Sequence, residues 1–194
     1  YDTANRRTDV SNGLGQLWSY YYDAQGQMVQ VQTPAVNGQR LSTSYLYDAE
    51  GNLTRVTDGL GNSVSYRYDA NGNRIHERDT VGNTVTRQYD GNNQLISETR
   101  YSVPATWSGA TGTWTEPPAS AAQVTRYILD VNGRSRYVVS ASGNVTGYLY
   151  NAAGLLVQEV SYTDAAYDLS GLTPEQAIAE ATLDAWVAAR NKAR

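Results

Sequence analysis

Residues 61–80 read Gly-Asn-Ser-Val-Ser-Tyr-Arg-Tyr-Asp-Ala-Asn-Gly-Asn-Arg-Ile-His-Glu-Arg-Asp-Thr and contain one complete β-hairpin pattern. The residues before Asp69 alternate between polar and apolar side chains, which is typical of a half-buried strand. A tight turn is predicted next, because Asp69 can cap it through its side chain and Gly72 accepts a positive φ. Residues 74–78 then predict the returning strand.

The same pattern returns along the chain at nearly constant intervals. Its Tyr-Asp mark, or a degenerate copy of it, recurs with spacings of 21, 25, 21, 21, 40 and 21 residues. The acidic or amide positions are Asp2, Asp23, Asp48, Asp69, Asp90, Asp130 and Asn151. Such a period indicates a stacked array of one supersecondary unit. The predicted fold is all-β, an array of antiparallel β-hairpins forming a continuous curving or spiralling sheet, with one C-terminal α-helix.

The residues that carry the repeat are assigned a structural role in these hairpins. This repeat signature consists of Tyr22, Asp23, Gly26, Tyr47, Asp48, Gly51, Tyr68, Asp69, Gly72, Tyr89, Asp90, Asp130, Gly133, Tyr150 and Gly154. A second glycine turn, such as Asp58-Gly-Leu-Gly61, follows in phase and predicts the opposite edge of the sheet. Paired tyrosines before each mark predict tyrosine ladders down one sheet face, where cross-strand aromatic pairs contribute about 0.2–1 kcal/mol each.

The two irregular intervals predict insertions. The interval of 25 holds a longer turn around residues 34–38, and the interval of 40 holds an ordered excursion in which Trp107 and Trp114 require burial. The predicted organisation is YD-repeat hairpins over 1–101, an excursion over 102–123, further YD-like repeats over 124–162, and an excursion over 163–194 that ends in a helix at about 173–191.

The helix prediction depends on a start signal at Thr173. This residue is a plausible N-cap, Pro174 suits the first helical position, and Gln176 completes a capping box. The helix would dock its alanine-rich face on the hairpin array.

Composition excludes several classes of function. The chain has 194 residues with a net charge of −4 and no basic cluster, so nucleic-acid binding is not expected. It contains no cysteine, which excludes disulfides and thiolate metal sites, and no cofactor is expected. No apolar run approaches the roughly 20 residues of a membrane helix, and no signal peptide is visible. Because Tyr1 already lies inside a repeat mark, we expect a piece of a longer protein.

The repeat resembles that of the RHS/YD-repeat family, the large β-shell proteins of bacteria and the animal teneurins. Tyr47-Asp-Ala-Glu-Gly-Asn-Leu53 matches the core of the family repeat, and the resemblance covers about residues 1–101 and 124–162. It implies successive hairpins that spiral into a hollow shell. In bacterial relatives the shell encloses a polymorphic C-terminal toxin, and in teneurins a similar barrel belongs to an adhesion receptor. The Asp-Pro-x-Gly motifs at which family members are capped and cleaved are absent, so neither cleavage nor toxicity is assigned here.

Candidate sites for chemistry have simpler structural explanations. His76 is the only histidine, it has no cysteine or second histidine as a co-ligand, and we interpret it as a surface or sheet-face residue. The Asp69-x-Asn71-x-Asn73 spacing lacks the later glycine and glutamate of a calcium loop. No catalytic and no metal-binding residue is therefore predicted. Trp107 and Trp114 stay as candidate ligand-binding residues, although such tryptophans more often anchor a loop.

These features leave three candidate functions. The first is a non-catalytic structural segment of a large RHS/YD-repeat protein, secreted or displayed on a bacterial surface, whose shell encapsulates or presents a C-terminal toxin or effector. Its partners would be the rest of the parent polypeptide and the enclosed toxin, and open sheet edges predict self-association. The alternative is an adhesin-like module that binds carbohydrate or a cell surface through exposed Tyr and Trp. An enzyme is least favoured, because Asp48, Asp69 and Asp90 share one turn position, as a repeated structural role requires.

Overall fold

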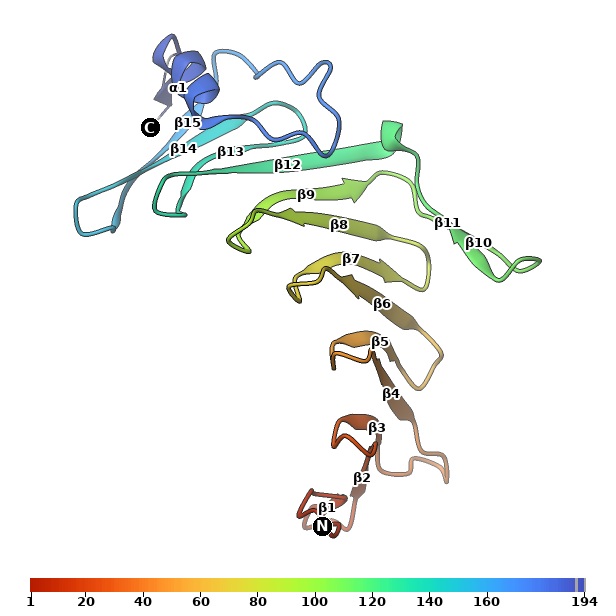
Figure 1. The fold of residues 1–194 in the computed structure, drawn as a ribbon. Coiled ribbons are helices and arrows are strands. Elements are labelled where there is room, and N and C mark those ends of the chain that lie inside the picture. Colours follow the sequence, from red (N-terminus) through yellow and green to blue (C-terminus); the bar gives the residue numbers. More distant parts are fainter. Residues whose placement is uncertain (191, 194) are drawn as a thin grey trace. The chain divides into compact units, whose positions relative to one another are not determined.

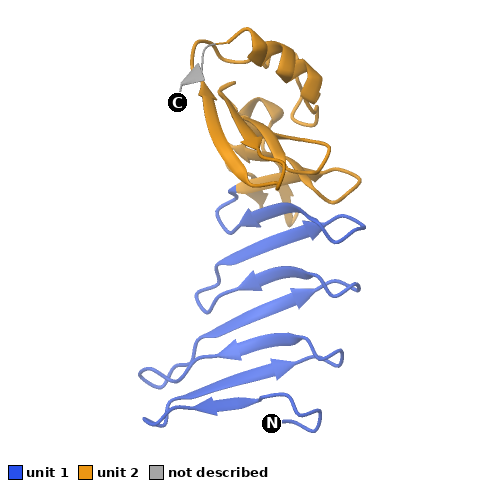
Figure 2. Cartoon of the chain, turned by 90° about the vertical axis from the view of Figure 1, so that its left-hand side faces the viewer, with its two compact units in different colours: residues 1–83 blue, residues 84–194 orange. Residues whose placement is uncertain are grey.

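The computed structural model describes residues 1–190, 192 and 193. It consists of antiparallel strands with one short helix near the C-terminus (Figure 1). The predicted all-β class, built from successive antiparallel hairpins with a single C-terminal helix, is confirmed. The chain divides into two compact units, unit 1 (residues 1–83) and unit 2 (residues 84–194), coloured separately in Figure 2 and described one at a time below.

Unit 1 is a meander in which each strand pairs antiparallel with the next one in the chain. Its strands are β1 (Asp9–Ser11), β2 (Leu17–Tyr22), β3 (Met28–Gln32), β4 (Ser42–Tyr47), β5 (Leu53–Thr57), β6 (Ser63–Tyr68) and β7 (Arg74–Asp79). The insertion between β3 and β4 is a longer turn closed by a bridge between Val36 and Gln39. Unit 1 is therefore a ladder of hairpins of the kind that the repeat predicts.

The two faces of the unit 1 sheet differ in chemistry. In the pairing register, Tyr45 lies opposite Val56, which in turn lies opposite Val64. Tyr45 therefore lies beside an aliphatic side chain and not beside another tyrosine, and the expected ladder of direct tyrosine pairs is not formed in this row. On the other face, Ser44, Thr57 and Ser63 align in the same way, so this face is polar.

Unit 2 continues the hairpin pattern and adds an excursion and a helix. Its strands are β8 (Thr84–Tyr89), β9 (Leu95–Tyr101), β12 (Ala122–Leu129), β13 (Ser135–Val139), β14 (Val145–Tyr150), β15 (Leu156–Tyr162) and β16 (Lys192–Ala193), and they pair antiparallel in this order. The excursion between β9 and β12 holds a separate two-stranded hairpin of β10 (Thr106–Ser108) and β11 (Thr113–Thr115), followed by a short 3-10 helix at Ala119–Ala121. The division between the two compact units lies at 83/84. It does not test the boundaries predicted from repeat phase at 101/102, 123/124 and 162/163, which stay predictions.

The helix is shorter than its sequence signals indicate. Helix α1 covers Glu180–Ala188 and is preceded by Ala179 in an extended conformation, with φ −69° and ψ 140°. Thr173 and Gln176 do form the side-chain bond of a capping box, since the Thr173 amide donates to Gln176 Oε1 at 2.8 Å. However, the Arg126 guanidinium of β12 donates hydrogen bonds to the carbonyls of Thr173, at 2.8 Å, and Gln176, at 2.9 Å. The capped turn is therefore tied to the sheet and does not continue as a helix, so the predicted start at Thr173 was wrong.

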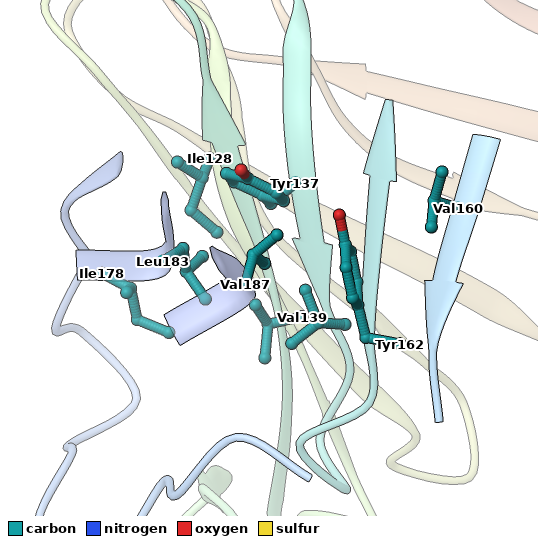
Figure 3. Close-up of a cluster of buried hydrophobic side chains, with 9 residues drawn as sticks. Ile128, Tyr137, Val139, Val160, Tyr162, Ile178, Leu183 and Val187 are labelled. Carbon is teal, nitrogen blue, oxygen red and sulfur yellow. The ribbon is translucent and has the colours of Figure 1, made fainter. Parts of the chain in front are cut away.

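The hydrophobic core lies entirely in unit 2. Figure 3 shows Ile178, Leu183 and Val187 from the C-terminal segment gathered against side chains of the sheet strands. The sheet contributes two aligned rows, Ile128–Tyr137–Gly147–Val160 and Arg126–Val139–Val145–Tyr162. These rows lie on the face opposite Tyr148 and Tyr150, which hold the positions of the paired tyrosines. The C-terminal segment thus covers the face that is polar in unit 1.

Candidate functional site

The acidic residues and the histidine of the described chain do not gather into a metal-binding group. Across residues 1–190, 192 and 193, no group of three or more His, Asp or Glu is placed to hold a metal ion. His76 lies in β7 opposite Arg67, with 4% of its surface exposed, so it is a buried residue of the polar sheet face. An open hollow of about 640 Å³ lies between the turns at Asp23 and Asp48. Within the same described residues, no helix is long and apolar enough to span a membrane.

The repeated structural element is the Tyr-Asp turn, and its aspartate organises the turn. In the cleanest copy, Asp69 Oδ1 accepts the amides of Asn71 and Asn73, both at 2.9 Å. Its Oδ2 accepts Asn73 Nδ2 at 2.9 Å, and its backbone carbonyl accepts the amide of Gly72 at 3.1 Å. Gly72 has a φ of 82°, in the region that favours glycine. Every polar group of Asp69 is therefore used inside its own turn.

These hydrogen bonds keep the turn carboxylates ionised. Donation from Asn62 and Asn73 lowers the pKa of Asp58 and Asp69, respectively. Partial burial opposes ionisation of Asp48, but bonds from the Asn52 side chain and from backbone amides outweigh it and lower the pKa. A carboxyl group held charged in this way is unsuited to act as a general acid near neutral pH. The geometry thus gives these aspartates a turn-capping role.

The signature tyrosines bond backwards to the preceding hairpin. Each one lies at a register shift in its strand pair, as at Arg67/Tyr68. Tyr68 Oη, at the end of β6, donates to the carbonyl of Leu53 in the neighbouring strand β5 at 2.9 Å. The equivalent bonds run from Tyr22 to Arg7, from Tyr47 to Met28 and from Tyr150 to Ser135, at 2.9, 2.9 and 3.1 Å. Burial raises the pKa of Tyr47 and Tyr68, which keeps these hydroxyls protonated as donors.

The remaining signature positions hold the same places in their hairpins. Gly26, Gly51, Gly133 and Gly154 all have positive φ, between 76° and 89°, at the turn position of Gly72. Tyr89 ends β8 at the register shift Gln88/Tyr89. Asp23, Asp90 and Asp130 accept amides two or four residues on, as Asp69 does. The signature residues are therefore spread over successive turns, and four of them, Asp23, Tyr47, Asp48 and Gly51, line the open hollow described above.

The two excursion tryptophans do form a cluster. Trp107 and Trp114 lie opposite each other in the β10–β11 pair, with ring centroids 5.5 Å apart and planes tilted by 56°. The burial expected for both is not reached, because Trp107 is 54% exposed. Hydroxyl side chains surround the pair, and Thr111 bonds Thr113 at 2.7 Å between their Oγ1 atoms. The hairpin thus presents an uncharged aromatic and hydroxyl surface.

Sequence reasoning missed the residues that attach the C-terminal segment to the sheet. Tyr137 Oη donates to Asp184 Oδ1 at 2.5 Å, and Arg126 binds the turn at Thr173. Burial, together with the bond to Asp184, raises the pKa of Tyr137. The sequence did contain a signal for this contact. Val145 and Gly147 occupy the repeat positions that Ser63 and Ser65 hold in unit 1, so polar residues are replaced by apolar ones on this face, as expected for a face that is covered.

Comparison with known proteins identifies the repeat. Residues 1–35 and 47–84 match the family model described as RHS Repeat. These two segments of the chain carry RHS repeats. The two matched segments contain the turns capped by Asp2, Asp23, Asp48 and Asp69. The RHS repeat of this chain therefore corresponds to the capped turns and paired strands described above. No curated protein matches the chain.

Solved structures that match the chain include toxin complexes. A structure of the Photorhabdus luminescens Tc holotoxin pore with the TccC3-D651A mutation is 14% identical, with a TM-score of 0.45 over 85% of this chain. Crystal structures of TcdB2-TccC3-Cdc42 and of TcdB2-TccC3 without its hypervariable C-terminal region are each 12% identical, with TM-scores of 0.39 over 78% and 82% of the chain. The matched part makes up 11% of each of these chains.

Proposed function

We propose that this RHS-repeat chain is a non-catalytic segment of the wall of a β-shell, which encapsulates or presents a C-terminal toxin or effector of the same polypeptide. The observation that supports this proposal is the single-layer sheet of unit 1. No apolar side chain of residues 1–83, all of which the structure describes, is buried. A sheet that is stable without a second layer suits a wall that keeps two faces free.

Bonding between hairpins explains how such a wall holds together. Each RHS turn is closed by its own aspartate, and the tyrosine hydroxyls bind the previous hairpin, as Tyr47 binds Met28. Stability then comes from nearest-neighbour interfaces, as in other repeat arrays. No step of this arrangement needs a reactive side chain, which is why we propose a structural role without catalysis.

The parent protein would be secreted or displayed on a bacterial surface. Its partners would be the rest of the RHS polypeptide and the enclosed domain. We also predict self-association through the edge strands of the sheet, because an unpaired strand edge is a template for pairing.

Single cysteines can test the wall directly, because the chain has no native cysteine. Thr43 and Leu46 lie on opposite faces of β4, since side chains alternate along a strand. In the full-length parent protein, we expect Thr43→Cys and Leu46→Cys to differ in their reaction with a bulky maleimide. The face that is shielded should become reactive when the C-terminal domain is deleted. Equal labelling of both faces, unchanged by the deletion, would contradict encapsulation.

A second candidate function is carbohydrate or cell-surface binding by the β10–β11 hairpin. Its support is the paired Trp107 and Trp114 rings on an uncharged, hydroxyl-rich hairpin, since aromatic faces stack on sugar rings. Titration of the chain with neutral oligosaccharides, followed by tryptophan fluorescence, tests it. Binding that Trp107→Ala abolishes, while Trp186→Phe in the helix leaves it intact, would support this role. Absence of binding to any saccharide, with Trp107→Ala changing stability alone, would reject it.

A further inference from the structure

The residue four places after each turn aspartate, termed position four here, connects one repeat to the next. The first copy is Arg6, whose Nη1 donates to the carbonyl of Asp23 at 3.0 Å. In the second copy, Gln27 Nε2 donates to the carbonyl of Gly51 at 3.2 Å. Both bonds run forward, from one turn to the turn of the following hairpin.

The same bond in unit 2 spans an insertion. Gln94 Nε2 donates to the carbonyl of Gly133 at 3.1 Å, although 39 residues separate them in the chain. The excursion with β10 and β11 lies between them in sequence, yet the two turns remain neighbours. The bond therefore follows the order of hairpins in the sheet and is not a local feature of the chain.

The glycine of each receiving turn supplies independent evidence. A Cβ at Gly51 would lie 3.1 Å from Gln27 Nε2, and one at Gly133 would lie 2.0 Å from Gln94 Nε2. On the opposite edge of the sheet, Gly61 has the same φ of 89° as Gly51, but a Cβ there would meet nothing within 4 Å. Glycine thus suits the conformation on both edges, and at Gly51 and Gly133 it also leaves room for the side chain of the neighbouring turn.

The side chain at position four differs between copies. Asn52 donates Nδ2 to the aspartate of its own turn, Asp48, at 3.1 Å. Arg6 bonds its own aspartate through Nε and also reaches Asp23 through Nη1, whereas Arg134 donates to its own aspartate, Asp130.

The last copy differs from all the others. Its position four is Leu155, which has no donor and is 65% exposed. The turn of Asn151 therefore has no side-chain donor at position four.

We propose that position four, where it carries Arg or Gln, is a specificity-determining contact through which an RHS hairpin recognises the turn of the next hairpin. In the three bonds of this kind, the Arg or Gln side chain binds a backbone carbonyl of a glycine-containing turn. The fitting partner is therefore another turn of the same Asp-x-x-Gly kind. This contact selects the order and spacing of hairpins along one edge of the sheet, while the tyrosine hydroxyls bind in the backward direction.

The test compares two glutamines of the same turn in the full chain. Gln27→Leu removes the forward donor, and Gln25→Leu makes the same chemical change at an exposed residue of that turn. Amide hydrogen exchange is measured by NMR over residues 48–52, the turn that receives the bond. We expect Gln27→Leu to accelerate exchange there by about two- to tenfold, as loss of one hydrogen bond implies, and Gln25→Leu to leave it unchanged.

A third variant distinguishes donation from packing. Gln27→Arg places at this position the residue that Arg6 supplies in the first copy, so protection of residues 48–52 should return to the wild-type level. Unchanged exchange in Gln27→Leu, equal acceleration in Gln25→Leu, or failure of Gln27→Arg to restore protection would each overturn the proposal.

Discussion

Units 1 and 2 are made of the same hairpin repeat but are stabilised in different ways. Unit 1 buries no apolar side chain, whereas the core of unit 2 contains fully covered residues such as Tyr137, Val139 and Leu183. The difference comes from the C-terminal segment, which lies on one sheet face in unit 2 only. The same repeat can thus serve as a bare sheet or as a scaffold for a second layer.

The comparison shows which interactions the repeat itself provides. In unit 1, turn capping by aspartate, the tyrosine bonds to the preceding hairpin and the forward bonds of position four hold the strands in register. Each of these contributes little alone, since a net hydrogen bond contributes about 0.5–1.5 kcal/mol. In unit 2, burial adds larger contributions at single positions. Mutations should therefore have concentrated effects in unit 2 and distributed effects in unit 1.

The largest effect is expected from Leu183→Ala in α1. Leu183 is fully buried, and truncation of such a leucine costs about 2–5 kcal/mol because it loses apolar contacts and leaves a cavity. Urea unfolding followed by residue-resolved NMR should show β12–β15 destabilised while unit 1 keeps its midpoint. The control is Leu46→Ala in β4, where the side chain is 56% exposed and little change is expected. An equal loss of stability in both units for Leu183→Ala would mean that the core is not specific to unit 2.

The next effect is expected at Arg126, which joins the sheet to the segment before α1. Arg126→Met keeps the length of the side chain but removes the donors to Thr173 and Gln176. Loss of bonds from a charged donor to two carbonyls should destabilise unit 2 by about 1.5–3 kcal/mol. Amide exchange of residues 173–176 should accelerate more than that of β13. Unchanged exchange in that turn would show that packing alone holds it.

The sequence was sufficient to predict unit 1 almost completely. The alternation around Tyr66, the Asp69 turn and the fixed spacing depend on contacts within a hairpin and its neighbours, so each repeat encodes its own geometry. The direction of the tyrosine bonds was not predictable in this way. A register shift places Tyr68 over Leu53 of the previous hairpin, and periodicity alone does not specify such a shift.

Unit 2 was less predictable because its decisive contacts are long-range. The capping box at Thr173 forms locally. However, Arg126, far away in the sequence, donates hydrogen bonds to carbonyls that would accept the backbone amides of the next helical turn. The Trp107–Trp114 pair was predicted to need burial, although a cross-strand pair satisfies each ring partly by the other. Local patterns therefore predict the hairpins well, but they do not predict which face a distant segment covers.

Acid should weaken unit 1 more than unit 2. The pKa values of Asp2, Asp48, Asp58 and Asp69 are lowered in the folded chain, so the unfolded chain binds more protons as pH falls. Their stabilisation is fully present above the unfolded pKa of about 3.9 and is lost as pH falls through the lower folded values.

Turns of unit 2 include caps that do not titrate in this range. Ser140 Oγ accepts the amide of Asn144, and Asn151 Oδ1 accepts the amide of Leu155. Residue-resolved urea titrations at about pH 6 and about pH 3 should therefore show a larger loss of midpoint in unit 1. The opposite order would show that the charged caps do not dominate the acid response.

The smallest effect is expected from a single tyrosine hydroxyl, and it separates bonding between hairpins from packing. Tyr68→Phe removes the donor to the carbonyl of Leu53 and keeps the ring, so unit 1 should lose about 0.5–1.5 kcal/mol in urea unfolding. Tyr66→Phe changes a tyrosine of the same strand and face whose ring lies under the Arg74 guanidinium, and it should stay within about 0.5 kcal/mol of wild type. Equal losses in the two variants would assign the role of the signature tyrosine to its ring. A selective loss in Tyr68→Phe would assign it to the hydroxyl, and would explain why this position in the RHS repeat carries tyrosine when phenylalanine would fill the same space.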